Sequence, residues 1–387
     1  MDRVSLSRPQ RILNGHLWIF SNELSVSPKL FAPGSLVEVY DKKENFLGIG
    51  YINPASLIAI RLLTREREEI NAAFFRRRIT DAIEYRKRVL CDISSCRLIF
   101  SEADFLPGLI VDKFGDCLVA QFLTLGMEGF RDMVLGVLDE ILVPSVIVLK
   151  NDSSSRTLEG LPLGKEIVKG NSDAAPVVIK EGEVLLEVSL LSGQKTGFFL
   201  DQRQNRLALG RLVRGGNGLD LFCYSGAWGL QLARNGAEVT FVDDSEGALS
   251  LADNNARLNN LSDRCSFVRE DVFSFLAKQR QMGVLYDFIV LDPPAFVKAR
   301  GKIKEGLRGY KKANALAMRL LKKGGILATS SCSYHVDRTT FFEMLRSAAK
   351  DAAKGPRLIE YRSQGPDHPV LLSVPETEYL KCAFLEM

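Results

Sequence analysis

The fold of this chain is decided by a stretch near its middle, residues 219–229, which reads Leu-Asp-Leu-Phe-Cys-Tyr-Ser-Gly-Ala-Trp-Gly. Its apolar half predicts a buried strand, and Gly226 predicts a tight turn into a helix. Glycine at such a turn lets the backbone approach a ligand closely. The stretch lacks the complete Gly-x-Gly-x-x-Gly pattern, and no Gly-Lys-Ser/Thr follows it, so dinucleotide-binding and P-loop sites are disfavoured.

From residue 217 onward, predicted strands alternate with predicted helices. The strands are expected at residues 218–223, 238–242, 266–269, 287–291 and 326–330. This alternation is typical of a parallel, doubly wound sheet, so the C-terminal half is predicted to be α/β and Rossmann-like. Two more strands, at 357–361 and 379–385, are separated by a Pro-rich segment and could form a closing hairpin.

Acidic residues mark the ends of the first three of these strands: Asp220, Asp243 and Asp271. A carboxylate at the end of the second strand typically accepts hydrogen bonds from ribose hydroxyls. Each acid taken alone could equally be the N-cap of the next helix. Three such acids and a glycine turn together favour a nucleoside cofactor. Its predicted contacts here are Asp220, Phe222, Tyr224, Ser225, Gly226, Asp243, Ser245, Asp271 and Val272.

The fourth and fifth strands are each followed by a reactive side chain. Asp292 opens the turn Asp-Pro-Pro-Ala-Phe, whose prolines stiffen the chain beyond the strand. Cys332 follows the last strand among Ser330, Ser331 and Ser333, a polar setting that favours a functional thiol over a buried structural one. Cys223 also ends a strand and is the nearest rival. A thiol and a carboxylate at one sheet edge suit covalent chemistry on a pyrimidine ring, with Asp292 bonding to cytosine.

A further motif precedes the α/β half, at residues 193–205, where glycine, aromatic and charged residues alternate just before a predicted helix. The segment includes Lys195, Thr196, Asp201 and Arg203. Periodicity also allows a domain linker with an N-cap at Asp201.

Four motifs together resemble the RlmI-type ribosomal large-subunit RNA cytosine-5 methyltransferases. They are Asp-Leu-Phe-Cys-Tyr-Ser-Gly, Asp-Pro-Pro-Ala-Phe, Ser-Cys-Ser and Lys-Thr-Gly-Phe-Phe-Leu-Asp-Gln-Arg. The similarity extends over nearly the whole chain: residues 15–23 resemble the start of the family's PUA domain, and residues 367–369 and 375–381 resemble its ending. One departure is that no second cysteine lies between Asp292 and Phe296. The base that completes the reaction is therefore unassigned.

The resemblance implies a methyltransferase that uses S-adenosylmethionine, with Cys332 as nucleophile and Asp292 steadying the base. The resemblance also implies cofactor contacts from Thr196, Asp201, Arg203 and Asp292. Substrate contacts are expected from Lys195, Pro293, Pro294, Phe296, Arg76 and Arg77. The implied partner is large-subunit ribosomal RNA. An amino-group methyltransferase, which needs no thiol, and a non-catalytic RNA-binding protein remain as alternatives.

The first half of the chain predicts smaller domains. We expect a small β-barrel, PUA-like domain at residues 1–68, a linker helix within 69–95, a central α+β domain at 96–185 and the methyltransferase domain at 186–387. Nine arginines and lysines crowd residues 61–88, which fits a phosphate-binding face or, equally, a solvated helix with glutamate partners.

Composition narrows the functional classes. No apolar run approaches the ~20 residues that cross a bilayer, and the seven cysteines and three histidines show no metal-ligand spacing. We therefore expect a cytoplasmic protein with neither membrane nor metal as a partner. Nothing in the sequence decides the oligomeric state, and a homodimer is among the assemblies it allows.

Overall fold

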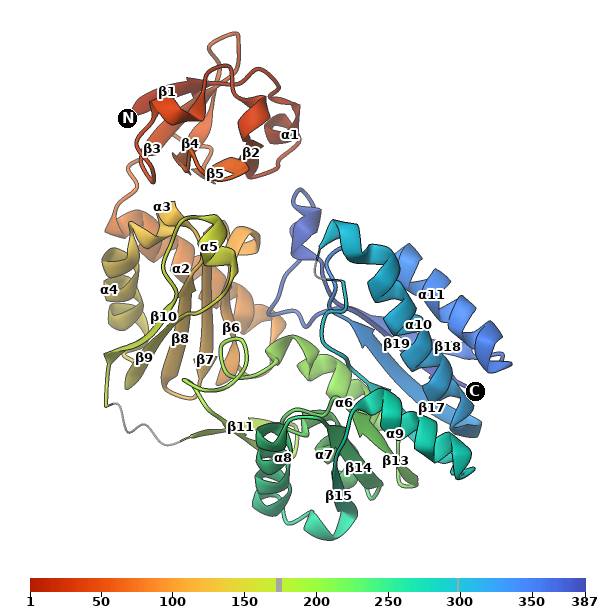
Figure 1. The fold of residues 1–387 in the computed structure, drawn as a ribbon. Coiled ribbons are helices and arrows are strands. Elements are labelled where there is room, and N and C mark those ends of the chain that lie inside the picture. Colours follow the sequence, from red (N-terminus) through yellow and green to blue (C-terminus); the bar gives the residue numbers. More distant parts are fainter. Residues whose placement is uncertain (172–175, 298) are drawn as a thin grey trace. The chain divides into compact units, whose positions relative to one another are not determined.

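The computed structural model describes residues 1–171, 176–297 and 299–387. These residues divide into two compact units (Figure 1). The N-terminal unit comprises residues 1–177, 188–200 and 366–377, and the C-terminal unit comprises residues 178–187, 201–365 and 378–387. Each unit is built from separate stretches of chain, so no single cut in the sequence would separate them.

The N-terminal unit begins with a five-stranded sheet in the order β1-β3-β4-β5-β2. The sequence pattern predicts strands at residues 35–40, 46–51 and 57–63. They are confirmed as β3 (Leu36–Tyr40), β4 (Phe46–Ile52) and β5 (Ile58–Thr64). The sequence pattern had not shown β1 (Asp2–Ser5), which pairs in parallel with β3, or β2 (Trp18–Phe20). Both are too short to display an alternating pattern of their own.

A second sheet in this unit has the order β10-β9-β8-β7-β6. Its strands are β6 (Ser95–Phe100), β7 (Leu109–Phe114), β8 (Cys117–Phe122), β9 (Val146–Asn151) and β10 (Gly164–Lys169). The helix α2 (Ala72–Val89) lies within the range 69–95 predicted to hold a linker helix. It is capped by Asn71, and its buried side chains share one core cluster with this sheet. The helix is thus a component of the central core as well as a connection.

The amphipathic pattern of residues 127–141 predicts one helix, and this prediction is wrong at its start. Two helices occur instead, α3 (Leu125–Glu128) and α4 (Arg131–Leu142). Helix α3 packs closely on the first sheet: a side chain at Gly126 would lie only 2.0 Å from the ring of Tyr51 on β4. Helical periodicity cannot reveal such a long-range contact. A second short helix, α5 (Ser155–Leu158), follows β9.

The C-terminal unit contains a seven-stranded sheet in the order β15-β14-β13-β16-β17-β19-β18. Its strands are β13 (Asn217–Leu221), β14 (Glu238–Asp243), β15 (Cys265–Arg269), β16 (Tyr286–Leu291), β17 (Leu321–Ser331), β18 (Arg357–Arg362) and β19 (Lys381–Glu386). The first five are parallel, as predicted, and β19 pairs antiparallel with both β17 and β18. The two tail strands therefore pair, but residues 366–377 between them belong to the N-terminal unit.

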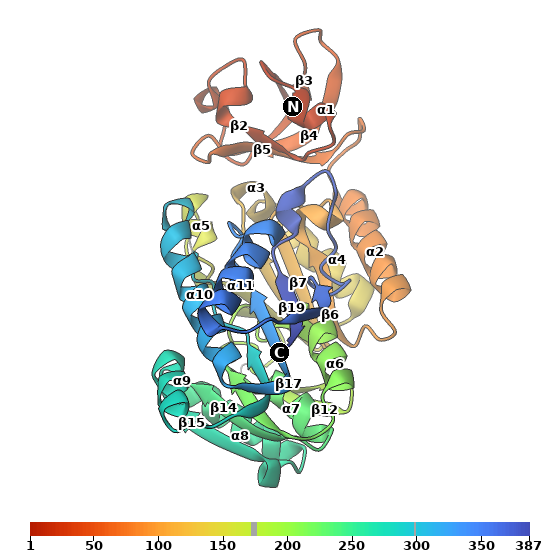
Figure 2. The ribbon, with the colours of Figure 1, turned by 90° about the vertical axis from the view of Figure 1, so that its right-hand side faces the viewer.

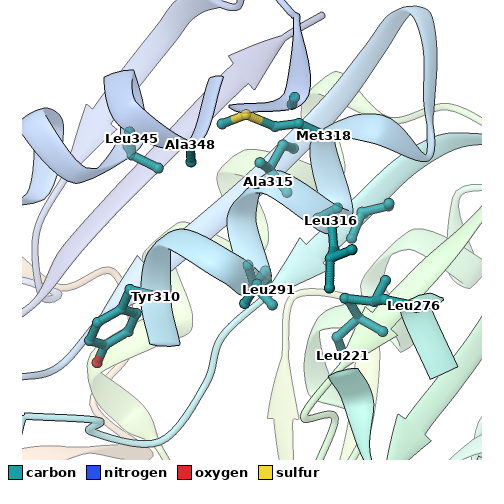
Figure 3. Packing of buried hydrophobic residues seen from close by; sticks show 14 of the residues in the cluster. Leu221, Leu276, Leu291, Tyr310, Ala315, Leu316, Met318, Leu345 and Ala348 are labelled. Atoms are coloured by element: carbon teal, nitrogen blue, oxygen red, sulfur yellow. The ribbon is translucent and has the colours of Figure 1, made fainter. Parts of the chain in front are cut away.

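Helices cover this sheet on both faces. They are α6 (Arg203–Leu212), α7 (Ala227–Arg234), α8 (Glu246–Leu258), α9 (Val272–Gln281), α10 (Ile303–Arg319) and α11 (Arg338–Ala352). Helices α9, α10 and α11 lie along one face (Figures 1 and 2), where their apolar side chains meet Leu219, Leu221 and Leu291 in one core (Figure 3). A two-stranded hairpin, β11 (Val177–Glu181) and β12 (Val184–Val188), precedes α6.

The chain changes direction across the sheet between β13 and β16. From β13 it runs outward to β14 and β15, and then returns to β16 and β17 on the other side. In open α/β sheets, ligands bind beyond the carboxyl ends of the strands at this switch point. The side chains that follow β13, β14, β16 and β17 are therefore the candidates for a functional site.

Candidate active site

The turn between β13 and α7 is strained, as a close-approach turn requires. Phe222 and Tyr224 both have left-handed backbone angles, with φ of 58° and 46°, and Gly226 follows with φ of 75°. Non-glycine residues in this region cost about 1–3 kcal/mol each and persist only where the surroundings impose them. Backbone N–H groups of Phe222 and Cys223 donate to Val242 O on the neighbouring strand, which holds the turn down. Ser225 is buried, and Asn255 binds its carbonyl.

Asp220 does not end its strand, contrary to the prediction. It is the fourth of the five residues of β13, and its side chain points away from the Leu219–Leu221 core toward α7. Its Oδ2 accepts the backbone N–H of Gly229 at 2.8 Å, whereas within the described residues its buried Oδ1 has no hydrogen-bond partner. Burial raises the pKa of Asp220 well above its usual value. A buried, half-satisfied carboxyl beneath the turn is a group that a ligand could complete.

Asp243 is the last residue of β14 and connects the turn to the next helix. One carboxylate oxygen accepts the N–H of Tyr224 at 3.1 Å, and the other accepts the N–H of Ser245 at 3.0 Å. Burial raises the pKa of Asp243, although these two backbone bonds act in the opposite direction. Each oxygen keeps a second lone pair for an outside donor.

Two of the predicted contacts serve as helix caps. Ser245 Oγ accepts the N–H of Ala248 at the start of α8, and Asp271 Oδ1 accepts the N–H of Ser274 at the start of α9. Val272 is 2% exposed and packs in the core. Ser245 and Asp271 are therefore N-caps of α8 and α9. The second carboxylate oxygen of Asp271 takes no part in its cap bond.

Asp292 follows β16 directly, as predicted, and two donors hold it. Gln202 Nε2 donates to Oδ1 and Trp228 Nε1 donates to Oδ2, each at 3.0 Å. Burial raises the pKa of Asp292, and nearby Asp201 adds to this effect, while the bond from Trp228 opposes it. The carboxyl is thus fixed in orientation and has an increased tendency to carry a proton.

The residues after Asp292 form an apolar wall. Pro293 is buried, whereas Pro294 is exposed. The ring of Phe296 lies 4.7 Å from that of Tyr310 and 6.2 Å from each of Phe222 and Phe273, measured between centroids. Aromatic rings grouped in this way can flank a planar ligand.

Cys332 follows β17 directly and is half-buried, as predicted for a reactive thiol. The neighbouring strand places Lys381 beside it: Lys381 Nζ donates to the carbonyl of Ser333 at 2.8 Å. The rival, Cys223, is 6% exposed, and burial raises its pKa well above the usual value. A thiol that resists ionisation is a poor nucleophile, so this environment favours Cys332.

The motif at residues 193–205 is divided between the two units. In the N-terminal unit, Lys195 is exposed with its ammonium 4.5 Å from the ring centre of Phe199, and Thr196 is fully buried and donates to Asp112. This commitment makes Thr196 a structural anchor instead of the predicted cofactor ligand. In the C-terminal unit, buried Asp201 accepts from Tyr379 Oη at 2.6 Å, and Arg203 opens α6.

Comparison with known proteins identifies the family. Residues 3–65 match the PUA-like domain family, and residues 166–370 match the S-adenosylmethionine-dependent methyltransferase family. The ribosomal RNA large subunit methyltransferase I of Pseudoalteromonas translucida is 38% identical over 98% of this chain and 97% of its own. That of Cronobacter sakazakii is 37% identical over 98% and 97%. This chain belongs to the ribosomal RNA large subunit methyltransferase I family.

A solved structure supports the fold. A SAM-dependent methyltransferase from Streptococcus mutans superposes with a TM-score of 0.85, covering all of both chains at 21% identity. The predicted PUA-like domain, Rossmann-like methyltransferase fold and cofactor S-adenosylmethionine are thus confirmed.

Sequence reasoning missed three side chains at this methyltransferase site: Gln202, Trp228 and Lys381. All three stand inside motifs that the sequence had singled out. Their polar groups could have indicated a role in the site. A buried indole or amide N–H needs an acceptor, and the carboxylate of the Asp-Pro-Pro turn is one. No sequence rule, however, pairs Trp228 with a residue 64 positions away.

Two predicted RNA contacts are engaged in ion pairs. Arg76 makes a bidentate pair with Glu140, and Arg77 bonds to Glu68. Both pairs are exposed, and exposed pairs contribute only about 0–1 kcal/mol, so phosphate could displace either partner.

Within the described residues no helix is long and apolar enough to cross a bilayer. Over the same residues, no group of three or more histidine, cysteine or acidic side chains is arranged to hold a metal ion.

Proposed function

We propose that this family member methylates carbon 5 of a cytosine in large-subunit ribosomal RNA through a covalent bond to Cys332. The observation that carries the proposal is the pairing of β16 with β17, in which Leu291 stands opposite Thr329. Because these strands are parallel and adjacent, Asp292 and Cys332 emerge at the same edge of the sheet. Ribosomal RNA is proposed as the substrate because the relatives are named as large-subunit ribosomal RNA methyltransferases.

The residues at the turn fit the cofactor. Among the described residues, Oδ1 of Asp220 has no hydrogen-bond partner, and the left-handed turn through Gly226 runs beside Asp243, whose oxygens hold it. We propose Asp243 for the ribose hydroxyls, and the turn residues Phe222, Tyr224, Ser225 and Gly226, with Asp271, for the remainder. When bound, S-adenosylmethionine supplies an electrophilic methyl group on sulfur.

The electron flow of the proposed reaction follows from the thiolate. Cys332 adds to ring carbon 6, and the electrons of the 5,6 double bond move to carbon 5. Bound cofactor would supply the methyl group to carbon 5, and the electrons of the former carbon–sulfur bond would stay on its sulfur. A base removes the carbon-5 proton, the double bond re-forms, and the bond from Cys332 to carbon 6 breaks to release the thiolate.

Asp292 can orient the base during these steps. Burial raises its pKa, so the protonated form is easier to reach than for a free carboxyl. In that form the carboxyl can donate to ring nitrogen 3 while its other oxygen accepts from the amino group. A hydrogen bond to nitrogen 3 withdraws electrons from the ring and makes carbon 6 more open to attack. Gln202 and Trp228 prevent the carboxyl from rotating away.

Product analysis tests the function. Full-length protein is incubated with large-subunit RNA and methyl-labelled cofactor, and the RNA is digested to nucleosides. We expect the label in 5-methylcytidine. Label in an N-methylated nucleoside would support the amino-group alternative, and no incorporation together with no cofactor binding would support the non-catalytic alternative.

Replacing Asp243 by alanine should weaken cofactor binding about tenfold or more. Charged hydrogen bonds contribute about 1.5–3 kcal/mol, and each 1.4 kcal/mol corresponds to a factor of ten in affinity. Calorimetric titration measures the change, with Asp263→Ala as control because this carboxylate is exposed and lies outside the proposed site. Unchanged affinity in a folded Asp243→Ala protein would remove Asp243 from the site.

We infer that RNA is held partly by a pocket in the N-terminal unit. This pocket of about 460 Å³ is lined by Leu17, Leu63, Thr64, Arg65, Glu66, Glu68, Arg77, Arg78 and Phe105. Phe105 is 39% exposed, and the Arg78 guanidinium lies 5.3 Å from its ring centre. Exposed aromatic and guanidinium planes are surfaces on which unpaired bases stack. Lys195, Pro293, Pro294, Phe296, Arg76 and Arg203 remain proposed ligand contacts outside this pocket.

We also propose the domain limits 1–68, 69–95, 96–185 and 186–387 and a cytoplasmic location. A homodimer would be compatible with this function but is not needed for it, since every proposed catalytic group is on one chain.

A further inference from the structure

We propose that Lys381 is a positioning residue that holds Cys332 in its thiolate form. This inference deepens the proposed function and rests on it, because a thiolate is required only if Cys332 is the nucleophile. It assigns a role to a cation that neither the family motifs nor the acid and thiol pair at the sheet edge had explained.

The position of Lys381 is fixed by the sheet. It is the first residue of β19, which pairs antiparallel with β17, and in that pairing it stands opposite Ser331. Its Nζ donates to Ser333 O at 2.8 Å and to Tyr379 O at 2.7 Å. The ammonium is therefore bound to the residue after Cys332 from a strand position opposite the residue before it.

The ammonium of Lys381 is buried against backbone carbonyls. Lys381 is 4% exposed, and Nζ donates to the carbonyls of Ser333 and Tyr379. In the described part of the chain, no carboxylate lies within ion-pair distance of Nζ. An isolated buried charge is costly unless an opposite charge compensates it. A thiolate at Cys332 would supply that charge.

The charges that face Lys381 agree with this pairing. Burial lowers the pKa of Lys381 to about 8, and Cys332 is the strongest of the groups that oppose this effect, ahead of Glu378 and Asp337. At pH 7 a group with this pKa is still mostly protonated. The positive charge is therefore present when the thiolate has to form.

The opposite side of the thiol segment is held by Tyr310 on α10. Its hydroxyl lies 2.9 Å from Ser333 Oγ, and burial raises its pKa, so it stays neutral. This tyrosine therefore adds no charge at neutral pH, whereas Lys381 brings a cation to the segment through its bond to Ser333 O.

The test measures ionisation of Cys332 directly, without RNA or methyl transfer. Full-length protein is treated with iodoacetamide from pH 5.5 to 10, and modification of the Cys332 peptide is followed by mass spectrometry. We expect the wild-type midpoint to lie below the ordinary thiol value of about 8.5. In Lys381→Met the midpoint should rise by about one unit or more, with alkylation at pH 7 slowed about tenfold.

Two further variants separate charge from structure. Lys381→Arg keeps the cation and should keep the low midpoint. Lys322→Met removes an exposed lysine of β17 that pairs with Asp287 and should leave the midpoint unchanged. A wild-type midpoint at or above about 8.5 overturns the proposal without any variant. Equal midpoints in wild type and folded Lys381→Met overturn it as well.

The result is independent of the methylation assay. If the midpoint shifts as expected but RNA gains no 5-methylcytidine, the role of Lys381 stands and the cytosine-5 assignment fails. If 5-methylcytidine forms but the alkylation midpoint of Cys332 is the same in Lys381→Met as in wild type, the cytosine-5 assignment stands. A group other than Lys381 then activates Cys332.

Discussion

Cys332→Ser is expected to abolish RNA methylation while cofactor affinity stays nearly unchanged. A serine hydroxyl ionises far less than a thiol at neutral pH and is too weak a nucleophile without a dedicated base. The change removes little volume from a half-buried position, so the fold should persist. Methyl incorporation measures the first effect, and calorimetric titration with cofactor measures the second.

A trapped adduct identifies the thiol. RNA that carries 5-fluorocytosine should form a stable covalent complex with wild-type protein, because fluorine at carbon 5 blocks the final proton removal. Cys332→Ser should form none. Cys223→Ser, the matched control from the other strand-end thiol, should still form the complex. Loss of the complex only in Cys223→Ser would make Cys223 the nucleophile in place of Cys332. Near wild-type methylation by Cys332→Ser would instead favour methyl transfer to an amino group.

Glu181→Gln should destabilise the C-terminal unit by about 3–5 kcal/mol, the cost of leaving one member of a buried ion pair alone. Glu181 on β11 accepts two bonds from Arg206 on α6, one of them at 2.6 Å, and both side chains are 2% exposed. Burial by itself would lower the pKa of Arg206. The charge and hydrogen bonds of Glu181 raise that pKa by a larger amount, so the arginine stays charged. Without Glu181 that charge has lost its principal counter-ion.

The two tryptophans allow this loss to be measured in one unit. Trp18 is in the N-terminal unit and Trp228 is in the C-terminal unit, so in a Trp18→Phe background the fluorescence reports the C-terminal unit. Urea unfolding followed in this way gives the free energy of unfolding. Glu183→Gln is the control, because its exposed pair with Lys180 should contribute about 0–1 kcal/mol.

A double variant distinguishes charge from packing. Glu181→Leu combined with Arg206→Met removes both charges and should recover much of the lost stability, since apolar replacements of buried pairs are often neutral or stabilising. A loss below about 1 kcal/mol in Glu181→Gln would show that water reaches Arg206.

Local chemistry explains why much of the C-terminal unit could be predicted from sequence. Apolar runs of five or six residues with turns between them specify buried parallel strands, and a polar residue after such a run must lie at the sheet edge. Asp243, Asp292 and Cys332 were placed correctly on this basis. The same rule failed for Asp220, because β13 continues through it, and strand ends cannot be read to one residue.

Contacts between distant segments were decided only by the tertiary structure. Helix α3 contains Gly126, which packs on Tyr51, 75 positions earlier. The donors that hold Asp292 come from two other elements, and Thr196 turned out to be bound to Asp112. Such pairings depend on which side chains meet after the elements pack, and no local periodicity encodes that.

The sequence by itself determined the class of fold, the family and the chemical groups at the sheet edge, because these follow from residue type and short-range pattern. Only the tertiary structure showed the surroundings of those groups. Burial raises the pKa of Cys223 and of Asp292, and the antiparallel addition of β19 to β17 brings Lys381 to Cys332 across 49 positions of chain. Burial and charge proximity are properties of the packed molecule, and they decide which thiol can react.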